Sequence, residues 1–158
     1  AIFLTSFLLI KYWLYNKEII KSFDESNKNL NKIIFFGIGS AVLLTVHSIF
    51  LGIKFDNDLY KLFRRVVMLS FIIFEIVAQA YLVLTLYKIK NKILNYINIK
   101  FLVAKRILVT ALIIVAIISI PIISTPGYKF LKHALEWDYF VGVISFYLLT
   151  FFMWKKSN

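Results

Sequence analysis

The sequence predicts an all-α integral membrane protein, a bundle of about five transmembrane helices with short loops. Two observations lead to this fold class. Of the 158 residues, 61% are hydrophobic, well above the roughly 45–50% of a soluble domain. These residues are grouped in long apolar blocks, and about 20 helical residues are enough to cross a hydrocarbon core about 30 Å thick.

The apolar blocks divide residues 1–158 into a single transmembrane domain. The polar stretches between the blocks are short, and none of them is long enough for a soluble domain. Because the chain opens at Ala1 inside an apolar run, we expect a truncated first helix with further residues upstream. The predicted spans are Ala1–Tyr15, Ile33–Ile53, Val66–Tyr87, Ile107–Ser124 and Phe130–Trp154.

Basic residues predict the orientation of these spans, because Lys and Arg gather on the inner side of a membrane. Lys11, the stretches 16–32 and 88–106, and the C-terminal end together hold 13 basic residues, and the opposite side holds six. We therefore place the C-terminus inside. Trp13, Trp137 and Trp154 fall near segment ends, where tryptophan is expected to anchor a helix at the interface.

The positive charge also predicts partners. A net charge of +11 would suggest nucleic acid in a soluble protein, but lysines beside membrane spans orient the chain and attract anionic lipid headgroups. We expect contact with the lipid bilayer, with anionic headgroups at the inner lysines, and with other membrane subunits or a second copy of the chain, but no nucleic acid. A residue choice heavy in Ile, Phe, Lys, Asn and Tyr indicates an AT-rich coding sequence, so a bacterial inner membrane and an organellar membrane both stay open.

Glu75 is the first candidate functional residue. It lies in the middle of Val66–Tyr87 and is the only charged residue of that span. A carboxylate at a bilayer centre costs several kcal/mol unless it is neutralised, paired or hydrated, so its presence there indicates a functional site. Gln79 follows four residues later, on the same helix face.

Two interpretations of Glu75 and Gln79 stay open. In the first, a protonated Glu75 and Gln79 hold two helices together by hydrogen bonds. In the second, the carboxylate lines a cavity and binds a proton, a cation or a small solute. His47 is the candidate partner, because antiparallel neighbouring spans place it within about 4 Å of Glu75 along the membrane normal. His47 has an alternative partner in a nearby backbone or hydroxyl group of its own helix.

A second polar cluster, formed by His133, Glu136 and Asp138, lies near the outer end of the last span. On a helix His133 and Glu136 are three residues apart and can meet. We interpret the cluster as a solvated outer interface, and a shallow site shared with His47 stays open. Such ligands suit zinc, and two histidines suit one haem, but no fixed-spacing motif supports either. We therefore expect no metal and no cofactor.

Three functions follow from these features. We expect a non-enzymatic subunit or scaffold of a larger membrane assembly, because the loops are short and small residues at 37–41 favour close helix packing. The chain has no cysteine and no catalytic motif. The alternative is a small transporter or channel protomer that uses Glu75, Gln79 and His47. The third is a lipid-modifying enzyme that uses the outer cluster.

Overall fold

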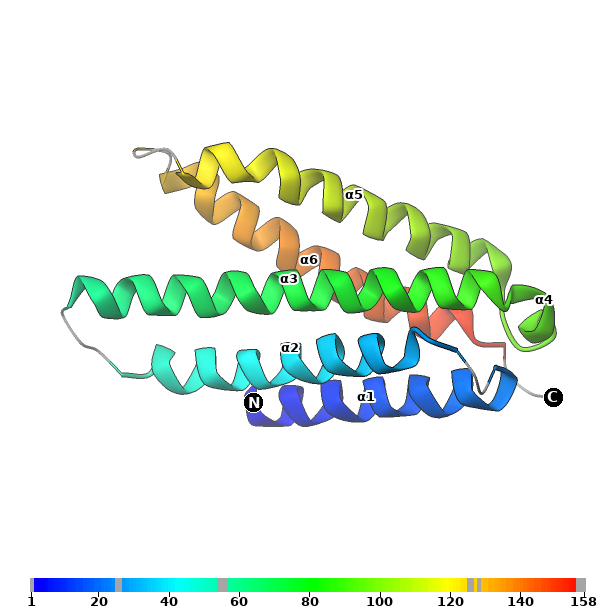
Figure 1. Cartoon of the computed structure of the whole chain (residues 1–158). Helices are drawn as coiled ribbons and strands as arrows, with labels where there is room; N and C mark the ends of the chain where they lie inside the picture. The colour runs from blue at the N-terminus through cyan, green and yellow to red at the C-terminus, as the bar shows by residue number, and fades with distance from the viewer. Residues whose placement is uncertain (1, 25–26, 54–56, 125–126, 128, 156–158) are drawn as a thin grey trace. The chain divides into compact units, whose positions relative to one another are not determined.

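A computed structural model describes residues 2–24, 27–53, 57–124, 127 and 129–155, without the side chains of 2, 120–124, 129, 132, 133 and 136 (Figure 1). The predicted all-α fold is confirmed, because the described residues form six helices and no strand. The helices are α1 (Ile2–Phe23), α2 (Leu30–Leu51), α3 (Asp58–Lys88), α4 (Lys90–Ile93), α5 (Ile99–Ser124) and α6 (Lys129–Met153).

Three stretches of the described chain are long and apolar enough to cross a membrane. They are α2, α3 and the part of α5 from Ile99 to Ser119. The stretch Trp137–Met153 of α6 is apolar but shorter. These stretches indicate a membrane-embedded chain.

Two helices, α3 and α5, each begin eight residues before the start that the apolar runs predict. α3 starts at Asp58, where the Leu59 N–H donates to the Asn57 side-chain oxygen over 3.0 Å. α5 starts at Ile99, where the Lys100 N–H donates to the Asn98 side-chain oxygen over 3.1 Å. In both cases an asparagine satisfies a free amide of the first turn. The helices therefore include polar residues that hydropathy assigns to the connections.

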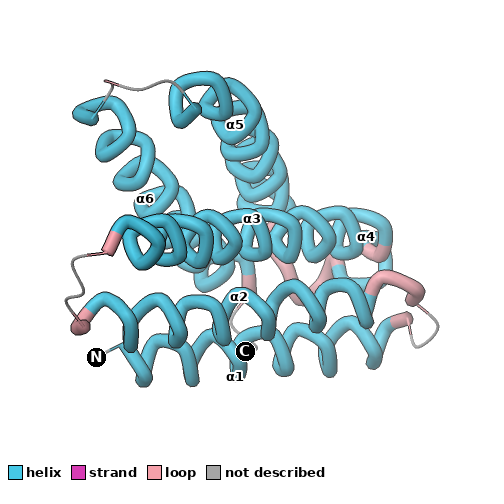
Figure 2. Tube along the Cα trace, turned by 60° about the vertical axis from the view of Figure 1, so that its left-hand side comes forward, coloured by secondary structure: helices cyan, strands magenta, loops and turns pink. Residues whose placement is uncertain are grey.

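The chain forms two compact units, Ala1–Thr85 (unit 1) and Leu86–Asn158 (unit 2). In unit 1, α1, α2 and α3 run side by side (Figure 2). A Cβ atom on Gly37 would lie 2.4 Å from the Trp13 ring of α1, and one on Gly39 would lie 2.7 Å from the Phe74 ring of α3. Gly37 thus faces α1 and Gly39 faces α3. The close helix packing predicted at these small residues is confirmed.

Trp13 does not act as the expected interfacial anchor. Its side chain is fully buried between α1 and α2, whereas Trp137 is 68% exposed. The physical reason is the missing side chain of Gly37, which leaves space for the indole ring. Burial of this large ring against α2 stabilises the α1–α2 contact.

In unit 2, α5 and α6 form a hairpin that backbone hydrogen bonds close at one end. The Asn98 N–H donates to the Met153 carbonyl over 2.8 Å, and the Lys155 N–H donates to the Tyr96 carbonyl over 2.9 Å. Further along the hairpin, Gly142 of α6 contacts the Leu112 side chain of α5. The segment before α5 is therefore tied to the segment after α6.

Candidate functional site

Glu75 lies at the contact between α2 and α3 within unit 1. Its side chain is fully buried, as are those of Ser40 and Gln79. The Ser40 Oγ of α2 lies 2.7 Å from Glu75 Oε2, and Gln79 Nε2 donates to Glu75 Oε1 over 2.9 Å. The carboxyl group thus links two helices, and Gln79 contacts it from the same face, as the four-residue spacing predicts.

The hydroxyl of Ser40 indicates which protonation state suits this arrangement. A serine hydroxyl has one proton to donate, but Ser40 Oγ lies 2.8 Å from the Gly37 carbonyl as well as 2.7 Å from Glu75 Oε2. An ionised carboxylate would compete with the carbonyl for this proton. If Glu75 is protonated, its hydroxyl can donate to Ser40 Oγ, and the Ser40 proton is then left for the Gly37 carbonyl. The neutral acid therefore satisfies both contacts.

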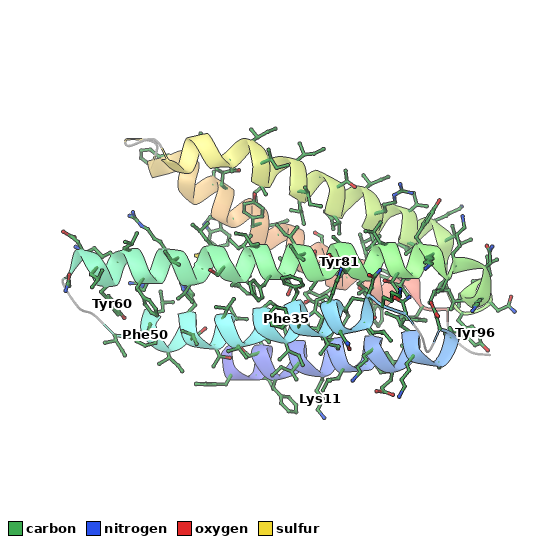
Figure 3. All side chains as sticks on the ribbon, viewed as in Figure 1. Lys11, Phe35, Phe50, Tyr60, Tyr81 and Tyr96 are labelled. Carbon is green, nitrogen blue, oxygen red and sulfur yellow. The ribbon has the colours of Figure 1, made fainter. Side chains whose placement is uncertain are left out.

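Aromatic rings fix the register of α2 against α3 around the carboxyl group. Phe36 packs against Phe74, with the ring centroids 5.2 Å apart, and stacks on Tyr81 at 6.2 Å. Phe35 lies 5.9 Å from Phe74. The Lys32 ammonium lies 5.3 Å from the centroid of the Tyr81 ring. Figure 3 shows Phe35 and Tyr81 on facing helices.

A shallow apolar hollow lies near the start of α3, and Glu75 does not line it. The Tyr60 hydroxyl lies within hydrogen-bonding distance of the carbonyls of Phe50 and Ile53, which ties α3 to the end of α2 (Figure 3). The hollow is lined by Asn57, Leu59, Tyr60, Leu62, Phe63 and Val66.

His47 lies further from Glu75 than the sequence predicts. The 2.7 Å contact places Ser40 opposite Glu75. Because His47 follows Ser40 by two helical turns, it lies about 10 Å further along α2. Aligning the midpoints of the two predicted spans gives an axial offset of only about 4 Å between His47 and Glu75. Hydropathy locates the midpoint of each span, but it does not give the register of one helix against the other. A role for His47 beside Glu75 and Gln79 stays a prediction.

The second cluster lies mostly outside the described residues. The side chains of His133 and Glu136 are not described, and Asp138 is exposed on α6. Within the part of the chain that the structure describes, no three His, Asp or Glu side chains come together as metal ligands.

Sequence reasoning missed Lys105. Its side chain is fully buried in the α5–α6 hairpin. Its Nζ donates to the Thr150 hydroxyl over 2.6 Å and lies 3.9 Å from the centroid of the Phe146 ring. Counting basic residues places Lys105 in an inner loop. A signal was present, since Lys105 continues the three-and-four spacing of the buried apolar residues Leu102, Val109 and Leu112.

These features define an all-α protein that has three described helical stretches long and apolar enough to cross a membrane, and buried polar contacts in each of its two helical units. Comparison with models of known protein families, with curated proteins and with solved structures gives no match.

Proposed function

We propose that the protein is a non-enzymatic multi-pass membrane protein that acts as a subunit or scaffold in a larger membrane assembly. The arrangement of Glu75, Ser40 and Gln79 supports this proposal. A protonated Glu75 can donate to Ser40 and accept from Gln79 at the same time, and it thereby links α2 to α3, which is a structural role. The carboxyl group therefore needs no substrate to compensate its burial.

The outer face of α1 supports contact with a partner. Phe3, Leu4, Phe7 and Leu8 are each more than half exposed. Together they form a wide apolar face on a helix whose second half carries Lys17, Glu18 and Lys21. Lipid or an apolar helix of another subunit suits such a face.

In the proposed arrangement, the stretches 16–32 and 88–106 and the C-terminus lie on the inner side of the membrane, because these parts of the chain carry the excess of basic residues.

Replacement of Glu75 tests the structural role. We expect Glu75→Gln to keep both assembly and stability, because an amide can donate to Ser40 and accept from Gln79. Glu75→Ala leaves buried polar groups without their partner and should lower the free energy of unfolding by about 2 kcal/mol. SDS-induced unfolding of the purified protein measures stability, and native electrophoresis of solubilised membranes measures assembly.

Two serines of α2 provide a matched control. Ser40→Ala removes the group opposite Glu75, whereas Ser48→Ala removes a hydroxyl that donates to the Leu44 carbonyl of its own helix over 2.7 Å. Ser40→Ala should be clearly more destabilising than Ser48→Ala. A Glu75→Gln protein as unstable as Glu75→Ala would contradict the structural role.

A small transporter or channel protomer is the second candidate function, with a site at Glu75, Gln79 and His47. One observation favours it. The Gln79 Oε1 atom is buried and has no hydrogen-bond partner among the described residues. This oxygen offers a ligand for a cation or a protonated solute beside the carboxyl group.

Proteoliposomes loaded with a pH-sensitive dye separate the two functions. If Glu75 carries protons, an imposed pH gradient decays faster in vesicles with the wild-type protein, and Glu75→Gln abolishes this decay while assembly remains intact. Equal decay for both proteins would exclude a proton pathway through Glu75.

A further inference from the structure

Two basic side chains of unit 2 share one aromatic ring. The Lys90 ammonium lies 4.4 Å from the centroid of the Tyr87 ring, and the Arg106 guanidinium lies 4.9 Å from it. Tyr87 belongs to the end of α3, Lys90 to α4 and Arg106 to α5. Neither cation has a carboxylate partner among the described residues. The two like charges therefore lie within about 9 Å of each other, and an anion near both would relieve their repulsion.

The sequence around this pair contains only basic charge. No Asp or Glu occurs between Glu75 and Glu136, and the acidic residues of unit 2, Glu136 and Asp138, lie near the start of α6. The far end of α6 adds a further cation, because Lys155 Nζ donates to the Leu94 carbonyl over 3.1 Å. The exposed basic residues at this end of unit 2 are Lys88, Lys92, Lys100, Arg106 and Lys155.

The connection between α3 and α5 also has the amphipathic character of a membrane-surface segment. Ile89, Ile93 and Ile97 are buried, whereas Leu94 and Tyr96 are 40% and 56% exposed. Figure 3 labels Tyr96 just below α4, near the right-hand end of the view. Tyrosine and leucine next to lysines are typical of segments that lie where headgroups meet acyl chains. The apolar stretch that begins at Ile99 places this connection at the border of a candidate span.

We propose that Lys90 and Arg106, positioned by Tyr87, form the centre of a binding site for the phosphate of an anionic lipid headgroup. The guanidinium binds two phosphate oxygens through its planar pair of N–H donors, and the ammonium adds a point charge. In the same connection, the exposed Leu94 and Tyr96 side chains contact the acyl boundary. Basic groups between helix ends on the inner side of a membrane suit such headgroups.

Native mass spectrometry of the full chain in detergent tests this site, with phosphatidylglycerol as the anionic probe and phosphatidylcholine as the neutral one. We expect the wild-type protein to retain phosphatidylglycerol preferentially. Each basic residue near a lipid surface contributes about fivefold in affinity, so K90Q/R106Q should weaken phosphatidylglycerol binding by about 25-fold. The charge-preserving K90R/R106K should keep the preference for the anionic lipid, and Y87L, which removes the ring, should weaken it.

K17Q/K21Q in unit 1 is the matched control. It removes the same number of predicted inner-side charges from a helix that also carries Glu18, and it should change binding less than twofold. Equal losses in the two double variants would show that net charge alone attracts the lipid and would overturn the site. Displacement of the lipid by millimolar inorganic phosphate would also overturn it, because the site would then recognise free phosphate.

Discussion

Gly37→Ala will destabilise unit 1 by about 3 kcal/mol, near the upper end of the usual cost of overpacking. The new Cβ atom would lie 2.4 to 2.8 Å from three atoms of the Trp13 ring. This ring is fully buried and rigid, so it can relieve the overlap only if α1 moves away from α2. Thermal unfolding in detergent micelles should show a large fall in midpoint temperature.

Gly52→Ala provides the control. Gly52 ends α2 with φ −74°, a conformation that alanine adopts without strain, and its nearest contact would be ordinary, at 3.7 Å from the Ile49 carbonyl oxygen. We expect a change within about 0.5 kcal/mol. If Gly37→Ala is equally mild, the close contact between Trp13 and α2 is not a stabilising feature of the fold.

Thr150→Val will destabilise unit 2 by about 2 kcal/mol, because it leaves the buried Lys105 amino group without its hydrogen-bond acceptor. Lys105 would then keep the Phe146 ring, whose centroid lies 3.9 Å from its Nζ, as a neighbour among the described residues. Replacing Lys105 by methionine as well removes the polar group that lost its partner. We therefore expect Lys105→Met/Thr150→Val to be more stable than Thr150→Val alone.

A double-mutant cycle measured by SDS unfolding gives the coupling between the two residues. Thr110→Val is the matched control on α5, since the exposed Thr110 hydroxyl donates only to the Arg106 carbonyl of its own helix, over 2.9 Å. Additive effects of the Lys105 and Thr150 substitutions would mean that the 2.6 Å contact contributes nothing to stability.

The sequence predicts the helices well because each long apolar run requires a helix to satisfy its backbone in lipid. It also predicts that Glu75 and Gln79 meet, because both lie on one helix and the helical repeat fixes their spacing. The starts of α3 and α5 are less predictable. Their polar first turns depend on capping by Asn57 and Asn98, and hydropathy does not detect capping.

Contacts between helices could not be predicted in the same way. Ser40 is separated from Glu75 by 35 residues and Lys105 from Thr150 by 45. The register that brings each pair together comes from side-chain packing, such as Phe36 against Phe74. The apolar run around Glu75 therefore identifies a buried acid, but it does not identify the partner of that acid on another helix. The count of basic residues places the buried Lys105 in a loop.

The backbone closure of the α5–α6 hairpin has a consequence for the order in which the protein is made. The Asn98 amide and the Tyr96 carbonyl leave the ribosome before all of α6, yet their partners are Met153 and Lys155. Those two groups cannot reach their native partners until translation of the helical region is complete. The backbone groups of Tyr96 and Asn98, between α4 and α5, therefore lack these hydrogen-bond partners during synthesis. The two bonds form only after α6 and Lys155 have been made.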